Sequence, residues 1–473
     1  MTPPEARPGK LPYDTGTRLV SSRLFAVLLL VGALARALVL PLGGTHDTVP
    51  WRIWAYNAAN EGVSRLYGVG GTPPEWRTLT YLNAEGQATY PPLALHELGL
   101  AGRVFKWANS GDFPNTTALM VAVKMPALVA DVGMALLAYL VVRRRVGEAA
   151  ARWACCACWL NPAVVLDGAA LGYLDPQFVL PIVASLVAAA SGRGALAGVL
   201  AAAAVLTKPQ PAVIGPAVAL ALWHSTTDMA VRLRRFGAAL AGGLACAALL
   251  VGPIIAVGAW PNFLHAMQRI EAQDMLSGYG ANIWWIVGWA VRVVYSAPDM
   301  GWWPAIVAPA KILGSSRFIE IGGPDPRPIA LISLLLVGGW AVWTTRRATD
   351  LWTQAALGAF LVHAFGVLGV PVHENHMFAA VPLLALAAAG QPAYRAPFFV
   401  VSAIVALNLN LFYGISEDTG WAIPRTLTVI DASLVLAAIN CAALVWHLRR
   451  IRTVARHKSA SRPAARARAA CDL

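Results

Sequence analysis

Charged side chains are scarce in this sequence. Only 13% of its 473 residues are Asp, Glu, Lys or Arg, whereas a soluble globular protein carries about 25%. Hydrophobic residues make up 58% of the chain and gather in runs. This composition excludes a soluble enzyme, a disordered protein and a partner of nucleic acid. It is typical of a protein that crosses a lipid bilayer several times.

Cysteine patterns and internal repeats are also missing. The six cysteines have neither the spacing of a metal site nor that of a disulfide framework. Most of them lie in or beside apolar runs, where cysteine behaves as a small apolar residue. No repeat of fixed period is visible, which argues against a transporter built from duplicated halves.

Apolar runs recur along the whole chain. A membrane-spanning helix needs about 20 apolar residues, or fewer where it is bent. The sequence therefore predicts an all-α integral membrane protein with about 12 transmembrane helices. One polytopic domain would cover residues 1–448, before a basic, disordered cytoplasmic tail over 449–473, and a weaker run over 282–297 would be re-entrant or half-buried. The runs lie near residues 24–40, 119–142, 153–170, 176–190, 194–207, 211–223, 237–258, 328–345, 352–370, 377–390, 396–412 and 427–447.

The net charge of +13 comes from basic residues at particular places. Eight of them lie in the last 25 positions, and others lie in short connections between apolar runs. Cytoplasmic connections of membrane proteins are rich in Lys and Arg, so we expect both termini in the cytoplasm and the protein in the inner (plasma) membrane. The basic residues of the short connections are Arg143, Arg144, Arg145, Arg193, Arg232, Arg234, Arg235, Arg346, Arg347 and Arg395.

Two long loops then fall on the periplasmic or extracellular face, over residues 41–118 and 258–328. Loops of this length are usually functional rather than mere connections. Within the first, residues 49–66 mix apolar and polar side chains in a way that suits a short amphipathic helix on the membrane surface.

Asp47 follows the first apolar run directly, within Gly43-Gly44-Thr45-His46-Asp47-Thr48. A carboxylate at the outer mouth of a helix bundle could act as a general base, because a low-dielectric neighbourhood raises its pKa toward neutrality. The alternative is a helix cap or a solvated loop acid.

His373, Glu374 and His376 lie at the outer end of another run. Ionisable residues at a membrane edge are functional candidates because they are costly there. The spacing is not that of the metalloprotease helix motif, whose histidines are four residues apart. The alternative is a polar cluster at the interface.

Lys208 lies between two runs, in Thr207-Lys208-Pro209-Gln210. A lysine at that depth needs a counter-ion such as phosphate, or else it extends its amine to the interface. Asp175 could contact a sugar or cap the helix that follows it. Lys124 and Asp131 are seven residues apart, so they share one helix face and point into the bundle if that face is buried.

Several short motifs together resemble the GT-C superfamily of polytopic glycosyltransferases, which take sugars from polyprenyl-phosphate carriers. The Tyr-Pro-Pro element is prominent in its dolichyl-phosphate-glucose-dependent members. The chain departs from the eukaryotic pattern at Thr89, where that pattern has an acid, and at Asn375, where a basic residue usually follows the His-Glu pair. The matching elements are Asp47, Tyr90-Pro91-Pro92-Leu93, Asn161-Pro162 with Gly172-Tyr173-Leu174-Asp175, Lys208-Pro209-Gln210, Tyr279-Gly280-Ala281-Asn282-Ile283-Trp284 and His373-Glu374.

The resemblance implies an inverting enzyme that moves a hexose, mannose or glucose, from a polyprenyl phosphate to a lipid- or glycan-linked acceptor on the outer face. Asp47 would be the general base, and His373 and Glu374 would complete the catalytic set. No cofactor is required, and a divalent cation is allowed but not demanded. The alternatives are a transporter or flippase for a lipid-linked sugar, and a glycan ligase or polymerase. The residues expected to bind the donor are Tyr90, Asp175, Lys208, Gln210, Asn282, Trp284 and His376.

Overall fold

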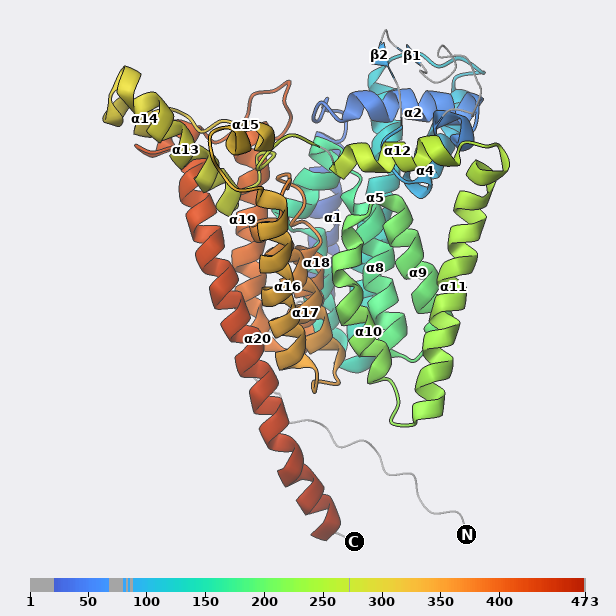
Figure 1. The fold of residues 1–473 in the computed structure, drawn as a ribbon. Helices are drawn as coiled ribbons and strands as arrows, with labels where there is room; N and C mark the ends of the chain where they lie inside the picture. The colour runs from blue at the N-terminus through green and yellow to red at the C-terminus, as the bar shows by residue number, and fades with distance from the viewer. Residues whose placement is uncertain (1–20, 68–79, 82–83, 86–87, 272, 472–473) are drawn as a thin grey trace.

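The computed structural model describes residues 21–67, 80–81, 84–85, 88–271 and 273–471. Most of these residues form one bundle of helices, and shorter helices lie across one end of it (Figure 1). We call this end the loop end. The strands in the described part are two residues long each, β1 (Thr80–Tyr81) and β2 (Ala84–Glu85), paired antiparallel.

Helices of the bundle coincide with the predicted apolar runs. Within the described residues, seven helices are long and apolar enough to cross a membrane, or eight if a pair bent by 43° counts as one span. Four further apolar helices have only 10–17 residues. The seven are α1 (Ser22–Val39), α5 (Thr117–Arg145), α11 (Met229–Ala256), α16 (Pro326–Thr345), α17 (Leu351–Leu368), α19 (Arg395–Tyr413) and α20 (Ala432–Cys471).

The helical membrane architecture is thus confirmed, whereas the predicted number of about 12 spans is not. A helix rises about 1.5 Å per residue, so the short helices fall short of a hydrocarbon core of about 30 Å. Proline explains one of these breaks, because Pro209 and Pro211 separate α9 from α10. The bent pair consists of α6 (Glu148–Trp159), α7 (Pro162–Val164) and the π-helical turn η2 (Val165–Leu171). The four short apolar helices are α8 (Asp175–Ala190), α9 (Gly194–Thr207), η3 (Gln210–Ile214) with α10 (Gly215–Trp223), and α18 (Ala380–Gly390).

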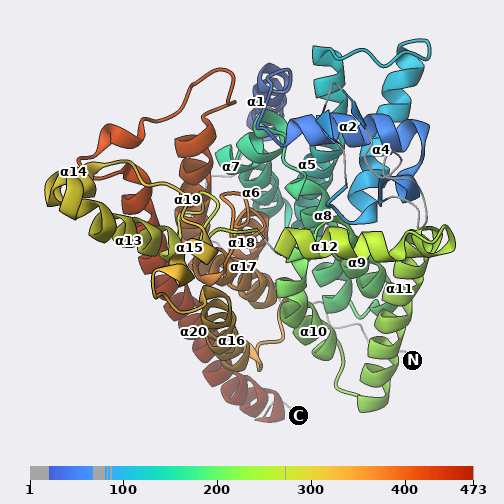
Figure 2. The ribbon, with the colours of Figure 1, turned by 45° about the horizontal axis from the view of Figure 1, so that its top comes forward.

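The long loops hold most of the helices at the loop end. The amphipathic segment predicted over 49–66 is helix α2 (Thr48–Asn60) followed by a short turn, η1 (Val63–Tyr67). Helices α2 and α12 lie across the bundle in both views (Figures 1 and 2). The other helices of these loops are α4 (Pro92–Ala108), α12 (Trp260–Glu271), α13 (Ile283–Met300), α14 (Trp302–Val307) and α15 (Ser315–Glu320).

The predicted tail over 449–473 overlaps the end of the last helix, and its boundary and disorder stay predictions. Helix α20 continues without a break through that segment to Cys471. Alanine and arginine dominate it, and both are strong helix formers, which explains why the helix does not stop where the apolar run ends. The last two residues, 472–473, lie outside the described part of the chain.

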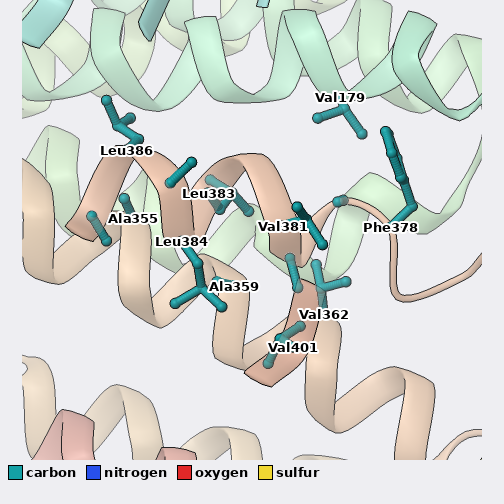
Figure 3. Close-up of a cluster of buried hydrophobic side chains, with 14 of the residues drawn as sticks. Val179, Ala355, Ala359, Val362, Phe378, Val381, Leu383, Leu384, Leu386 and Val401 are labelled. Atoms are coloured by element: carbon teal, nitrogen blue, oxygen red, sulfur yellow. The ribbon is translucent and has the colours of Figure 1, made fainter. Parts of the chain in front are cut away.

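The centre of the bundle is α17 and α18. All residues of α18 from Ala380 to Ala389 are buried, and α17 is buried around nearly its whole circumference. Their side chains pack against each other and against Val179 of α8 (Figure 3). Peripheral helices instead expose apolar side chains; Leu249 of α11, for example, is 75% exposed. Exposed apolar side chains of this kind are expected on helices that are surrounded by lipid. Because α17 and α18 are both buried in the bundle, they hold the connection between them in place at the loop end.

Lys124 and Asp131 both point into the bundle, as their spacing predicted. Asp131 Oδ2 accepts a hydrogen bond from Arg36 Nε of α1 at 3.2 Å. Lys124 Nζ donates to the carbonyls of Leu42 and Ala170 at 2.8 and 2.7 Å. The two residues therefore tie α5 to the end of α1 and to the π-helical turn, which is a structural role.

The topology can be tested by cysteine labelling in a variant without native cysteines. Ser316 is exposed in α15 at the loop end, and Thr227 is exposed at the opposite end between α10 and α11. A membrane-impermeant maleimide should label Ser316→Cys in intact cells, and Thr227→Cys only after permeabilisation. The reverse pattern would contradict the predicted orientation.

Candidate functional site

Asp47 directly precedes α2, but its side chain makes no capping hydrogen bond there. The side chain is exposed although protein surrounds it closely. Burial by this surrounding protein raises the pKa of the Asp47 carboxyl, and the positive charge of Lys208 partly opposes the rise. The capping alternative is thus not what the structure shows. The exposed side chain is open to solvent and to a reactant, and its role as a general base stays a prediction.

A segment that the sequence reasoning missed holds the Asp47 turn in place. It follows α19, where Glu417 N donates to the Gly44 carbonyl at 3.0 Å and Ser416 Oγ accepts from Gly44 N at 2.8 Å. The Glu417 carboxylate lies 2.6 Å from His46 Nδ1. A short loop with adjacent acids on the predicted outer face was the signal that could have identified it.

Lys208 and Asp175 form a buried ion pair, with 3.0 Å between Lys208 Nζ and Asp175 Oδ1. Helix α9 ends at Thr207, and Lys208 takes an extended conformation before Pro209, which turns its side chain away from the helix path. Asn375 Nδ2 donates to the other carboxylate oxygen of Asp175 at 2.7 Å. Lys208 is only 7% exposed, so it does not extend to an interface. Asp175 acts as its counter-ion rather than as a simple cap.

Tyr90 belongs to the same cluster. Its ring centroid lies 5.1 Å from that of Trp51 in α2. Burial raises the pKa of the Tyr90 hydroxyl, and Lys208, which hydrogen-bonds to it, acts in the opposite direction. The Tyr-Pro-Pro element therefore places a phenol beside the Lys208 ammonium and, through it, close to Asp47.

Glu374 lies in the connection between α17 and α18. Its Oε1 accepts from the Tyr173 hydroxyl at 2.5 Å. Its Oε2 is buried and has no hydrogen-bond partner among the described residues. Burial raises the pKa of Glu374 to about 8, so the group is mainly protonated at neutral pH. Because Tyr173 occupies Oε1, the proton belongs on Oε2.

The two histidines of this connection are held as neutral rings. His373 Nε2 lies 2.7 Å from Gln273 Oε1, and the His373 backbone N–H donates to His376 Nδ1 at 3.3 Å. Burial lowers the pKa of His373 to about 4 and that of His376 well below its ordinary value. Neutral His376 therefore keeps its proton on Nε2, where it can serve as a donor.

Three predicted donor-binding residues differ in their contacts. The Gln210 amide oxygen and nitrogen are buried, with no partner among the described residues, which suits a ligand contact. Asn282 Oδ1 instead caps α13 by accepting from Trp285 N at 2.9 Å. Trp284 Nε1 donates to the Leu368 carbonyl at 2.8 Å and so fixes α13 to the end of α17. Asn282 Nδ2, like the Gln210 amide, is buried with no hydrogen-bond partner among the described residues.

Asp167 is a second residue that the sequence reasoning did not select. It lies in the π-helical turn η2, is fully buried, and neither carboxylate oxygen has a partner within the described ranges. The charges of Asp175 and Lys208 act on it. An acid inside an apolar run is a functional candidate by itself, so the signal was present. Across the residues that the structure describes, no group of three His, Cys, Asp or Glu side chains could hold a metal ion.

No protein-family model matches the chain, and no curated protein matches it. Among solved structures, it is similar to ArnT from Cupriavidus metallidurans bound to undecaprenyl phosphate, with 14% identity, a TM-score of 0.46, and coverage of 94% of this chain and 79% of that one. It is also similar to the Archaeoglobus fulgidus oligosaccharyltransferase tethered to an acceptor peptide, with 12% identity and a TM-score of 0.39. That match covers 92% of this chain but only 55% of the archaeal one. Both TM-scores are below 0.5, so any function must be argued from the chain's own residues.

The buried ion pair leads to a stability prediction. Lys208→Met should lower the unfolding free energy by about 3–5 kcal/mol, because it leaves the Asp175 charge buried without a partner. The double variant Lys208→Met/Asp175→Asn should recover much of that loss, since it removes the second charge as well. Chemical unfolding of the purified proteins in detergent measures both. Equal stability of the single variant and the wild type would show that the pair is not formed.

Proposed function

We propose that this protein is a GT-C-type glycosyltransferase of the inner (plasma) membrane. It transfers a sugar from a polyprenyl phosphate to an acceptor hydroxyl at the loop end, with both termini in the cytoplasm. The observation that carries the proposal is the position of Asp47: an exposed carboxylate with a raised pKa beside the buried Lys208–Asp175 pair. A base, a cation and neutral hydrogen-bond donors thus meet at one end of an apolar bundle.

The position of the cluster favours a lipid-linked donor. Nucleotide sugars are made in the cytosol and do not reach the outer face, whereas a polyprenyl-phosphate sugar does. Its hydrocarbon tail suits the apolar surface of the bundle, and its phosphate suits a site at the membrane edge. The Tyr90-Pro91-Pro92 element and the order of the other motifs favour a hexose, mannose or glucose, as the sugar.

The reaction is a direct displacement. Asp47 accepts the proton of the acceptor hydroxyl, whose oxygen attacks the anomeric carbon. The bond between that carbon and the phosphate oxygen breaks. The bonding electron pair stays on this oxygen, and polyprenyl phosphate is the leaving group. The configuration at the anomeric carbon is inverted. A phosphate leaves without prior protonation, so the chemistry demands no metal.

The leaving phosphate is negatively charged, so it is stabilised by hydrogen-bond donors that carry no negative charge themselves. Protonated Glu374 Oε2 and neutral His376 Nε2–H supply hydrogen bonds, and the orphaned Gln210 amide adds another. Lys208 adds positive charge, although Asp175 already offsets part of it. Donors that are fixed before the reaction stabilise developing charge without reorganising, which is the largest contribution in many enzymes.

Asp47→Asn is the principal test of the catalytic role. The substitution keeps the volume and the hydrogen bonds but removes the base, and general-base assistance is typically worth about 10²–10⁴ in rate. Turnover should fall by about that factor while expression and donor binding stay near wild type. Turnover is measured with labelled polyprenyl-phosphate mannose or glucose and a lipid extract of the host.

Glu61→Gln is the matched control, because Glu61 follows α2 in the same loop and pairs with Arg65 on the surface, at 3.2 Å. It should keep most activity. Two further acids of this loop, Glu75 and Glu85, have side chains outside the described residues, and their Gln variants serve as additional controls. An active Asp47→Asn together with an inactive variant of one of these acids would show that another carboxylate is the base.

The pH dependence separates the roles of the two acids. Turnover should fall as the pH drops through the raised pKa of Asp47, because a protonated base accepts no proton. It should also fall as the pH rises through about 8, because Glu374 then loses the proton it donates. Glu374→Gln keeps a donor and should stay active above that pH, whereas Glu374→Ala should be inactive. An inactive Glu374→Gln would show that the ionised carboxylate is required.

A further inference from the structure

Three polar side chains lie inside the bundle, where helices α17 and α20 pack against each other. They are His363 of α17 and Asn440 and His447 of α20, and all three are completely buried. Polar side chains inside a membrane bundle are costly, so they are functional candidates by default. The sequence reasoning selected none of them, and the mechanism described above uses none of them.

Hydrogen bonds join these side chains into one chain. Asn440 Nδ2 donates to the Ala281 carbonyl at 2.6 Å and to Met377 Sδ at 3.2 Å. Asn440 Oδ1 lies 2.9 Å from His363 Nε2. His363 Nδ1 lies in turn 3.2 Å from His447 Nδ1. The chain therefore runs from the inside of the bundle to two segments at the loop end.

One backbone carbonyl sets the direction of every hydrogen bond in this chain. A carbonyl only accepts, so the amide nitrogen of Asn440 must face Ala281 and the amide oxygen must face His363. His363 then carries its proton on Nε2, which leaves its Nδ1 as an acceptor for a proton on His447 Nδ1. His447 Nε2 is buried and has no partner among the described residues. Two neutral rings with opposite tautomers thus satisfy the chain.

The chain reaches the connection between α17 and α18 that carries Glu374 and the two histidines. Met377, which Asn440 contacts, lies in this connection on the side of α18. The other side is held by Gly278, in the segment before α13, whose N–H donates to the Val372 carbonyl at 2.9 Å. Asn440 bonds to that segment as well, through the Ala281 carbonyl. One amide therefore joins both supports of the connection.

We propose that Asn440 is a positioning residue for the hydrogen-bond donors on this connection, and that His363 and His447 fix the orientation of its amide. The inference rests on the proposed glycosyltransferase function. Asn440 acts through Met377 and Ala281 rather than by touching the substrate. Donors stabilise developing charge best when they are fixed before the reaction, so the chain supplies part of that rigidity.

Asn440→Leu tests this role in the full-length protein, because leucine keeps the volume but removes the amide. The value of kcat should fall by about 10²-fold, since misplacing a group by about 1 Å can cost that much. The half-saturating donor concentration should change far less, because the displaced donors act on charge that develops in the transition state. Both are measured with labelled polyprenyl-phosphate mannose or glucose and host lipid extract. Lower stability with unchanged kcat would overturn the proposal, because Asn440 would then only hold helices together.

His363 offers a matched pair of variants. His363→Gln places an amide nitrogen near the position of Nε2, where it can still donate to Asn440, whereas His363→Asn is one methylene shorter and falls short. Most of the wild-type kcat should therefore remain in His363→Gln and be lost in His363→Asn. Equal kcat in the two variants would contradict the positioning role.

Gln354→Leu is the control for the loss of a buried polar group. Gln354 is buried in the same helix, but its Nε2 donates to the Ala348 carbonyl at 2.6 Å, at the opposite end from the connection. Gln354→Leu should lower stability and leave kcat unchanged. A loss of kcat as large as that of Asn440→Leu would show that any buried polar group has this effect, and would overturn the proposal.

The histidine tautomers test the chain independently of activity. NMR spectra of the wild type labelled with ¹⁵N-histidine, in lipid, should show the proton on Nε2 of His363 and on Nδ1 of His447. The variants His363→Phe and His447→Phe assign the signals. A proton on His363 Nδ1 would reverse the Asn440 amide and overturn the proposal. Absence of any transfer by the wild type, with the expected tautomers present, would instead count against the proposed function, and the positioning role would fall with it.

Discussion

The ion pair between Lys208 and Asp175 is the interaction on which the site depends. A charge buried in an apolar bundle persists only if it is paired and hydrogen-bonded. Here the pair joins the break after α9 to the start of α8, and Asn375 extends it to the connection between α17 and α18. Segments far apart in the sequence are thereby held together, and the charge of the same lysine partly opposes the burial that raises the pKa of Asp47 and of Tyr90.

The apolar core supplies the rigidity that this pair needs. Helices α17 and α18 are buried almost completely, and their small alanine side chains allow close packing. The connection between them therefore emerges at a fixed place, with Glu374 and the two histidines on it. Ser416 and Glu417, in the segment after α19, hydrogen-bond to Gly44 and so hold the turn that carries Asp47. Asp47 and the neutral donors are thus held on separate segments of the chain that meet near the Lys208–Asp175 pair.

Much of this arrangement could be predicted from the sequence, because apolar runs and polar exceptions are strong signals in a membrane protein. The helical bundle and the shared inward face of Lys124 and Asp131 followed from such patterns. The grouping of Asp47, Tyr90, Lys208 and the His-Glu pair was expected from the family resemblance instead, and its catalytic role stays a prediction. The number of spans did not follow, because helix length depends on where proline breaks an apolar run. The sequence did not predict the hydrogen bond of Trp284 to the end of α17 or that of Glu417 to Gly44. These contacts join segments far apart in the sequence, so no local pattern reveals them.

The measurement that tests the central claim most directly is a transfer reaction with the purified protein. It combines labelled polyprenyl-phosphate mannose or glucose with a host lipid extract, and the anomeric configuration of the product is determined by NMR. The account predicts that label moves to an acceptor and that the product has the opposite anomeric configuration to the donor. Label that stays on the carrier while the intact donor crosses the membrane of a reconstituted vesicle would contradict it and would identify a transporter.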